Sequence, residues 1–315
     1  MSECISAVIC TLNEETNIAA CIESVKGVDE VVVADDGSED RTVEIAEEMG
    51  ARVFRRKDWA SYATQEDVDA FTERFGWAPR FTAGERIRNG NLEQMEAITA
   101  AANDWVICPD ADERVTWDLP RIRREILPKA DQVKGEFVHQ HNEDGSPVAV
   151  TTITKMFRQT SAVLAGRTHN VLLPMGRICE TDLYRIDHWP TADKQGYVLP
   201  ILEYSVIKED DQRSRFYLGR EYFYAWEREH ALELLTLYLD NGVWMPEIAQ
   251  ARLYAAACYW ELGRGDEARK SCLEAVLINP DHKAALELMS ELYFEPWKSK
   301  WAYIAANATD KDILF

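Results

Sequence analysis

The chain has 315 residues and a formal net charge of −20, and 46% of its residues are hydrophobic. This composition is typical of a globular protein, and the length favours two domains. The acidic balance excludes nucleic acid as the main partner, because binding to phosphates requires clustered Lys and Arg.

The sequence shows no membrane or secretion signal. No apolar run reaches the roughly 18 residues of a membrane-spanning helix, and the acidic N-terminus lacks the basic segment of a signal peptide. The seven Cys form no C-x-x-C pair, which favours reduced thiols. We therefore expect a cytoplasmic protein without stable membrane insertion.

The first hundred residues alternate between strand-like and helix-like segments. Three continuous apolar runs have the character of buried parallel strands, at residues 5–10, 30–35 and 51–55. Apolar residues at helical spacing predict two helices between these strands, over 16–26 and 38–50. The β-α-β-α-β order predicts right-handed crossovers and a parallel sheet with helices on both faces.

Residues 57–87 interrupt this alternation, and their aromatic and charged composition predicts a long loop with a short helix near 65–75. A second amphipathic helix is predicted over 91–102, leading into a fourth strand at 105–108. From 134 to 175 the sequence alternates as antiparallel strands do, and Asp144-Gly145 predicts a hairpin turn.

From about residue 212 the chain is helical and repeats itself. A small residue, a Tyr three positions later and an Ala nine positions after that recur around Tyr222, Tyr259 and Tyr293, which lie 37 and 34 residues apart. The pattern resembles tetratricopeptide repeats, whose period is about 34 residues; an unrelated helical bundle is the alternative. Such repeats hold extended peptides or associate with a second copy, so a peptide partner and a homodimer through this region are both open.

Polar motifs follow three of the four predicted strands. TLNEE (11–15) follows the first, Asp35-Asp36-Gly37 the second, and DADER (110–114) the fourth. In open α/β sheets, ligands bind at the carboxyl ends of the strands. Each motif alone could be an acidic turn, but together they predict one site at one edge of the sheet.

In this order and spacing, the segments ISAVICTLNEE, VVADDGSEDRT and DADE resemble family 2 glycosyltransferases, over about residues 3–190. The resemblance implies a Rossmann-like α/β domain of the GT-A nucleotide-diphospho-sugar transferase fold, at 1–205, and we expect an all-α helical-repeat domain at 206–315. It also implies a UDP-sugar donor, inversion at the transferred sugar, and Mn²⁺ or Mg²⁺ at a D-x-D motif.

The resemblance is strongest to small members similar to lipopolysaccharide-core glucosyltransferases and peptide glycosyltransferases. Because no basic amphipathic helix supports membrane attachment, we expect a protein or peptide acceptor, with its hydroxyl or thiol as the nucleophile. Lipopolysaccharide, or another glycan or lipid, is the alternative acceptor. A non-catalytic repeat scaffold with a relic nucleotide-sugar domain is the alternative of another class.

The resemblance assigns roles to individual residues. Asp110 and Asp112 occupy alternate positions, which point the same way in an extended segment. We expect Asp112 to bind the metal, with His188 as a further ligand, and Asp110 to bond the ribose or a metal-bound water. The donor is expected to contact a wider set of residues: Thr11, Leu12, Asn13, Glu14, Asp35, Asp36, Arg88, Asp110 and Ala111.

Several of these expectations are open in detail. Asp35 is expected to read the uracil, with Glu14 near the nucleotide. Arg88 and its neighbour Arg86 either complement the diphosphate or simply solvate a loop. Pro109 is a departure from the family pattern, because an aliphatic residue usually precedes the first Asp; we do not expect it to abolish the site.

An inverting transfer also needs a base to deprotonate the acceptor. Three positions are candidates: Glu113 beside the metal motif, Asp187 beside His188, and the Glu143-Asp144 pair, which we assign to the hairpin turn. We expect Asp112, Glu113 and His169 to be catalytic, with His169 contacting the acceptor or the diphosphate. Relatives often carry His-Glu where this chain has His169-Asn170. The base therefore stays unassigned.

Overall fold

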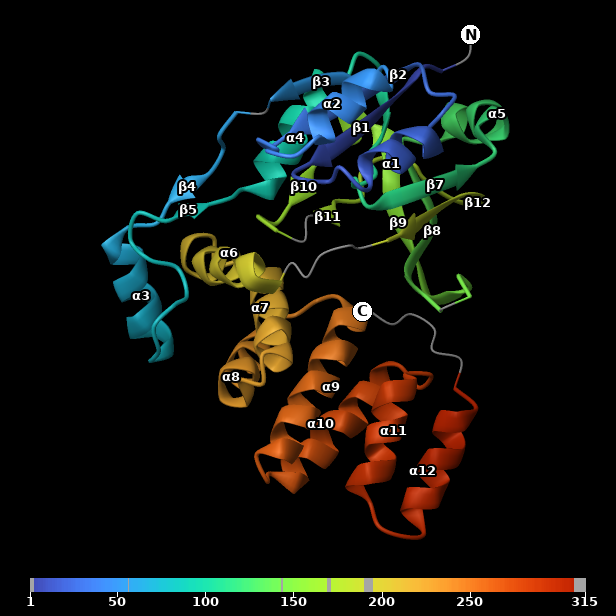
Figure 1. Ribbon diagram of the computed structural model, residues 1–315. Helices are drawn as coiled ribbons and strands as arrows, with labels where there is room; N and C mark the ends of the chain where they lie inside the picture. Colours follow the sequence, from blue (N-terminus) through green and yellow to red (C-terminus); the bar gives the residue numbers. More distant parts are fainter. Residues whose placement is uncertain (1–2, 56, 143, 169–170, 190–194, 309–315) are drawn as a thin grey trace. The chain divides into compact units, whose positions relative to one another are not determined.

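The computed structural model describes residues 3–55, 57–142, 144–168, 171–189 and 195–308 (Figure 1). The chain forms two compact units, one of residues 1–61 with 88–193 and the other of residues 62–87 with 194–315. The division into domains after residue 205 stays a prediction. No helix in the described ranges is long and apolar enough to cross a membrane.

The first unit is built on a mixed eight-stranded sheet with the strand order β3-β2-β1-β6-β9-β8-β12-β7. Its strands are β1 (Ile5–Thr11), β2 (Glu30–Asp35), β3 (Arg52–Arg55), β6 (Trp105–Ile107), β7 (Glu113–Trp117), β8 (Gln132–His141), β9 (Pro147–Arg158) and β12 (Ile178–His188). Short strands β10 (Leu164–Ala165) and β11 (Val171–Leu172) pair separately. The helices are α1 (Ile18–Ser24), α2 (Thr42–Glu48), α4 (Gly90–Ala100) and α5 (Leu119–Arg121), followed by a π turn (Ile122–Ile126) and a 3₁₀ turn (Leu127–Lys129).

The four strands predicted from the N-terminal half form the parallel part of this sheet, as β3-β2-β1-β6. Their alternating side chains bury both faces. Val8 and Val32 pack with α4, whereas Ile9 and Val33 pack with α1 and α2. This arrangement confirms the predicted helices on both faces of a parallel sheet.

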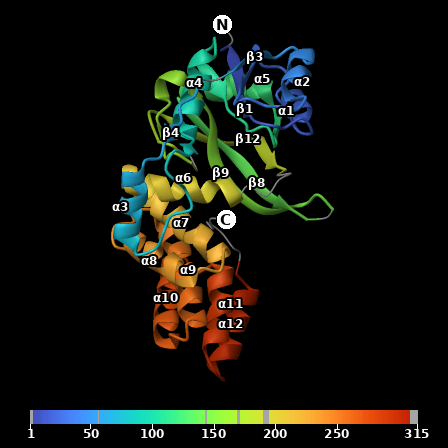
Figure 2. The ribbon, with the colours of Figure 1, turned by 60° about the vertical axis from the view of Figure 1, so that its left-hand side comes forward.

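The other half of the sheet is antiparallel, apart from the parallel pair of β8 with β12. The predicted hairpin joins β8 to β9 and projects from the sheet (Figures 1 and 2). Strand β7 has no counterpart in the sequence prediction, because Glu113 and Arg114 read as the end of an acidic loop. In the structure they begin a strand that pairs with the end of β12.

The second unit is helical, with α6 (Gln195–Lys208), α7 (Gln212–Tyr224), α8 (Arg228–Leu239), α9 (Met245–Glu261), α10 (Gly265–Ile278), α11 (Lys283–Leu292) and α12 (Trp297–Ala306). Helices α7 to α12 form three consecutive pairs (Figure 2). Small residues at the positions predicted from the repeat let the two helices of a pair approach closely. A Cβ added at Gly219 would lie 2.9 Å from Leu235 Cγ, and Ala256 and Ala268 are fully buried. The third copy is weaker, since Ala302 is exposed.

The predicted helix near 65–75 is α3 (Gln65–Phe75), and it belongs to the helical unit. Residues 62–87 also include part of β4 (Ser61–Tyr62), which pairs with β5 (Arg86–Ile87). Phe71, Phe75 and Phe81 share a core with residues of α6 to α9. The indole of Trp77 stacks on the His230 ring at 3.9 Å between centroids.

Candidate functional site

Strand pairing brings the three predicted motifs to one edge of the sheet. The β1–β2 register places Thr11 opposite Asp35, and Cys10 forms an isolated parallel bridge with Asp110. Thr11 is 4% exposed, and its Oγ1 has no hydrogen-bond partner among the described residues. An unsatisfied buried hydroxyl is costly, and this one lies at the edge of the sheet where the motifs meet.

The TLNEE motif is tied to the loop after β2. The Asn13 N–H donates to Ser38 Oγ at 2.9 Å, and the Glu39 N–H donates to Asn13 Oδ1 at 2.9 Å. Asn13 adopts a left-handed backbone with φ 54°, which Asn tolerates better than most residues. The Glu14 N–H donates to Thr42 Oγ1 at 2.8 Å, and Leu12 is exposed. The TLNEE motif therefore ties the loop after β1 to the loop after β2. Its contacts with the sugar-nucleotide donor stay a prediction.

Asp35 closes the turn that follows β2. Its buried carboxylate accepts hydrogen bonds from the N–H groups of Gly37 at 2.9 Å and Ser38 at 3.1 Å. Gly37 has φ 93°, a conformation that favours glycine. The carboxylate also lies 3.8 Å from Arg55 Nε. These contacts give Asp35 a structural role, and recognition of uracil by Asp35 stays a prediction.

The structure also brings Arg88 and Asp36 together. Arg88 Nη2 lies 2.7 Å from Asp36 Oδ2 and 2.7 Å from Glu93 Oε2. The Asn89 side chain caps α4 by accepting from the Leu92 N–H at 3.2 Å. Arg88 is therefore held by two carboxylates in this conformation, and a diphosphate would compete with them. Arg86 lies in β5.

A partly buried lysine that the sequence did not single out organises the DADER motif. Lys155, on β9, places Nζ 2.9 Å from Asp110 Oδ2 and 2.9 Å from Glu113 Oε1. The Glu113 Oε2 atom in turn accepts from the Asp110 N–H at 3.0 Å. The signal available in the sequence was a single cation within the otherwise uncharged strand TTITKMF.

The pKa values of these groups follow their burial and their charges. Burial raises the pKa of Glu113 to about 7, although the Lys155 ammonium acts to lower it. Partial burial works against the charged form of Asp110, but Lys155 outweighs it, so the pKa of Asp110 lies below its usual value. Burial would lower the pKa of Lys155, yet Asp110 and Glu113 raise it, so the ammonium stays charged.

The two residues predicted to bind a metal lie next to each other. His188 Nε2 is 3.4 Å from Asp112 Oδ2, because β12 and β7 pair His188 with Glu113. Burial lowers the pKa of His188, but the hydrogen bond and charge of Asp112 raise it above the usual value. Arg114 braces the motif by donating to the Ala111 carbonyl and to Asn17 Oδ1, each at 3.0 Å.

These residues fit a divalent cation that shares its coordination with a ligand. Within the described ranges, no group of three or more His, Cys, Asp or Glu side chains is arranged to hold a metal ion. Asp112 and His188 supply one oxygen and one nitrogen. Mg²⁺ and similar ions are commonly held by one or two protein side chains together with phosphates and water, so two side chains are sufficient for this type of site.

The remaining candidate acids are differently placed. Asp187 Oδ1 lies 2.9 Å from His141 Nε2, and Asp187 Oδ2 accepts from Arg185 Nε at 2.9 Å. Asp144 accepts from the Ser146 N–H at 2.9 Å, which confirms the predicted turn. Glu143, His169 and Asn170 lie outside the described residues.

The part of the chain that matches a known family contains the first two polar motifs. The family described as Glycosyl transferase family 2 matches residues 6–64. A lipopolysaccharide core biosynthesis glycosyltransferase, LpsC, from Rhizobium meliloti is 25% identical, over 76% of this chain and 82% of its own. A TPR repeat-containing protein from Synechococcus elongatus is 26% identical, over 59% of this chain and 40% of its own.

Among solved structures, a glucosyl-3-phosphoglycerate synthase from Mycobacterium tuberculosis in complex with phosphoglyceric acid aligns at 17% identity and a TM-score of 0.38. The alignment covers 64% of this chain and 79% of the other.

Proposed function

We propose that this chain, a glycosyltransferase of the family 2 type, transfers a hexose or N-acetylhexosamine from a UDP-sugar to an acceptor, with inversion at the anomeric carbon. The observation that carries the proposal is the convergence of Thr11, Asp110 and Asp112 on one sheet edge, with His188 beside Asp112. A buried hydroxyl, acidic groups and an imidazole at that edge suit a sugar nucleotide and a cation.

Each residue has a defined part in this proposal. Asp112 and His188 would hold the divalent cation, which when bound neutralises negative charge on the departing diphosphate. Asp110 would accept from the ribose hydroxyls. Lys155 fixes Asp110 and Glu113 in place through its two ion pairs. The Thr11 hydroxyl is buried in this conformation, so it would bond the nucleotide only after a local rearrangement exposes it.

The acceptor's base is not assigned. Glu113 has a pKa of about 7, which suits a base at neutral pH. However, Glu113 is 2% exposed, so an acceptor hydroxyl cannot reach it in this conformation. Asp187 would have to exchange His141 or Arg185 for the acceptor.

The test of the proposal is UDP binding and UDP-sugar hydrolysis with Mn²⁺. Wild-type protein is expected to bind UDP in calorimetry only when Mn²⁺ is present, and Asp112→Asn is expected to lose that binding. Asp144→Asn, which changes an exposed turn, is the matched control and should behave as wild type. A wild-type protein that binds no UDP and hydrolyses no UDP-sugar would favour the non-catalytic scaffold.

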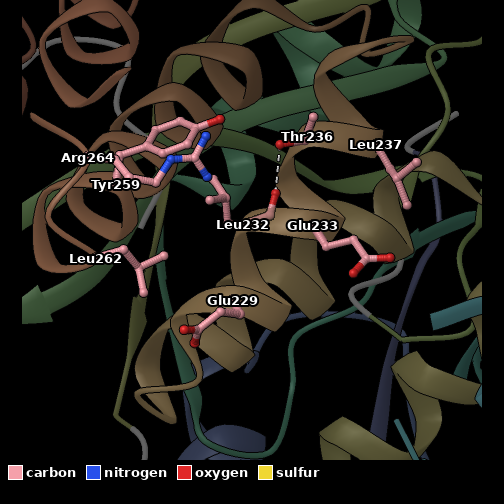
Figure 3. A pocket seen from close by; sticks show the side chains of 8 residues that line it. All are labelled: Glu229, Leu232, Glu233, Thr236, Leu237, Tyr259, Leu262 and Arg264. Carbon is pink, nitrogen blue, oxygen red and sulfur yellow. Dashed lines mark hydrogen bonds between the residues drawn. The ribbon is translucent and has the colours of Figure 1, made fainter. Parts of the chain in front are cut away.

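Two acceptor classes are supported by different observations. A protein or peptide acceptor is supported by the helical unit, which contains a hollow of about 390 Å³ (Figure 3). Its lining combines apolar and charged side chains: Glu229, Leu232, Glu233, Thr236, Leu237, Tyr259, Leu262 and Arg264. Repeat surfaces of this kind bind extended peptides or a second copy of the chain.

A carbohydrate acceptor is the second candidate. The relative with the broadest coverage of those described above is named for lipopolysaccharide core biosynthesis. Mass spectrometry of cell proteins and of lipopolysaccharide, each from cells with wild type or Asp112→Asn, separates the two classes. A hexose or N-acetylhexosamine mass shift seen only with wild type would appear in one fraction or the other.

A further inference from the structure

Trp189 presents an exposed indole beside the candidate metal ligands. Trp189 follows directly after His188, and its backbone N–H donates to the Asp112 carbonyl at 2.8 Å. The residue is 43% exposed. Single exposed aromatic residues are common on protein surfaces, so exposure alone assigns no role to this one.

The support beneath the indole distinguishes Trp189 from an ordinary surface tryptophan. Its ring lies on the His141 imidazole, with 3.9 Å between centroids and 9° between planes. His141 Nε2 is held 2.9 Å from Asp187 Oδ1, and the two side chains are only 6% and 9% exposed. Trp189 is therefore a flat ring fixed on one side by a buried pair.

Strand geometry places this ring beside the donor region rather than inside it. Successive strand residues point to opposite faces of a sheet, and here His188 contacts Asp112 whereas Asp187 contacts His141. Trp189 stacks on His141, so it lies on the Asp187 side of β12. The indole therefore lies on the face of β12 opposite the His188 side chain, and its link to the metal motif is the backbone hydrogen bond from the Trp189 N–H to the Asp112 carbonyl.

We propose that Trp189 binds a pyranose ring of a carbohydrate acceptor, an inference that rests on the proposed glycosyl transfer. The C–H face of a pyranose is apolar and its rim is polar, so it pairs with a flat aromatic ring flanked by polar groups. Arg185, whose side chain is 43% exposed, supplies such a group.

The surroundings of Trp189 fit a sugar better than a peptide. A peptide that adds a strand needs a free sheet edge; β12, which leads into Trp189, has none, because it is paired with β8 and β7, and the edge strand on this side is β7. Trp59 offers a contrast within the same unit. It is similarly exposed at 36%, but its Nε1 donates to Glu96 Oε2 at 2.8 Å in a side-chain contact on the flank of α4.

The experiment measures sugar binding and nucleotide binding separately in wild type, Trp189→Ala, Trp189→Phe and the control Trp59→Ala. The sugar probe is the core oligosaccharide released from Rhizobium meliloti lipopolysaccharide, titrated calorimetrically with UDP and Mn²⁺ present. Trp189→Ala should weaken oligosaccharide binding about tenfold or more, as loss of a buried aromatic anchor does. Trp189→Phe, which keeps a flat ring, should recover much of the loss, and Trp59→Ala should match wild type.

UDP affinity with Mn²⁺ serves as the readout of the donor site, and it should be equal in all four proteins. Equal oligosaccharide affinity in wild type and Trp189→Ala would overturn the inference, as would wild type that binds UDP but no oligosaccharide. A loss in Trp189→Ala that is confined to UDP-sugar affinity would also overturn it, because the indole would then bind the sugar of the donor. Transfer to a peptide that is unchanged in Trp189→Ala would also overturn it. Absence of UDP binding in wild type would instead overturn the proposed function itself.

Discussion

The ammonium group of Lys155 lies 2.9 Å from Oδ2 of Asp110 and joins two segments that are 45 residues apart in the sequence. The same ammonium pairs with Glu113, whose side chain is 3% exposed. A cation at the centre of an acidic motif limits the repulsion among its carboxylates before any ligand binds.

Replacement of Lys155 by Met should therefore destabilise the protein. The change removes the cation that favours the ionised form of the buried Glu113, so this side chain must stay charged without a partner or take up a proton, and breaking a buried pair from one side costs about 3 kcal/mol. Denaturant unfolding of Lys155→Met at pH 8 measures the loss. The double variant Lys155→Met with Glu113→Gln should recover part of it, because the remaining side chain is neutral; equal stability of the single and double variants would contradict this account.

Removal of divalent cations should abolish UDP binding, and Mn²⁺ should restore it. Replacement of His188 by Ala leaves Asp112 as the protein's remaining predicted ligand, so the Mn²⁺ concentration needed for half-maximal UDP binding should rise by about tenfold or more. Calorimetric titrations across a Mn²⁺ series measure the shift. His230→Ala, a change in the helical unit, is the control. UDP binding in excess chelator would argue against a metal-assisted site.

The helical unit should carry its own pH dependence through Glu203. This buried carboxyl accepts from Tyr222 Oη and from the Arg80 N–H, each at 2.6 Å. Burial raises its pKa from 4.5 to about 7, although these hydrogen bonds act to lower it. The folded state therefore binds the proton more tightly than the unfolded state, and stability falls as pH rises from 4.5 to 7.

The size of this effect is ~3 kcal/mol across that pH window. Glu203→Gln should remove it, because the amide stays neutral in both states. Chemical denaturation of wild type and Glu203→Gln at pH 5, 6, 7 and 8 measures the difference between the two proteins. A difference that does not change with pH would rule out Glu203 as the titrating group.

Replacement of Gly219 by Val should separate helices α7 and α8. A Cβ at this position would lie 2.9 Å from Leu235 Cγ, and overpacking of a tight contact costs about 1–3 kcal/mol. Thermal unfolding measures the loss. Adding Leu235→Ala should return part of the stability by making room, whereas Gly265→Ala, where the nearest heavy atom is 3.6 Å away, should be tolerated.

The parts of the fold that the sequence could predict are those set by local patterns. Buried runs such as 5–10 and 30–35 predicted neighbouring parallel strands, and the register of Thr11 with Asp35 confirms that their motifs share an edge. Gly219 and Tyr222 likewise predicted the close helix pair from spacing alone.

What could not be predicted depends on pairing between distant segments. Lys155 meets Asp110 only because β9 pairs with β6, and His141 meets Trp189 only through the pairing of β8 with β12. No local pattern carries that information. The placement of Phe71 with the repeat helices is likewise a packing outcome, since residues 62–87 have no repeat pattern of their own.

The path of the chain has a practical consequence for anyone dissecting this protein. The polypeptide enters the helical unit at residue 62, leaves it at 87 and returns at 194. A fragment that stops at residue 205 would therefore keep Phe71, Phe75 and Phe81 but lose most of the core that covers them, and such newly exposed aromatic surface promotes aggregation. The helical unit therefore cannot be exchanged between relatives as one continuous segment, because no single boundary in the sequence separates the two units.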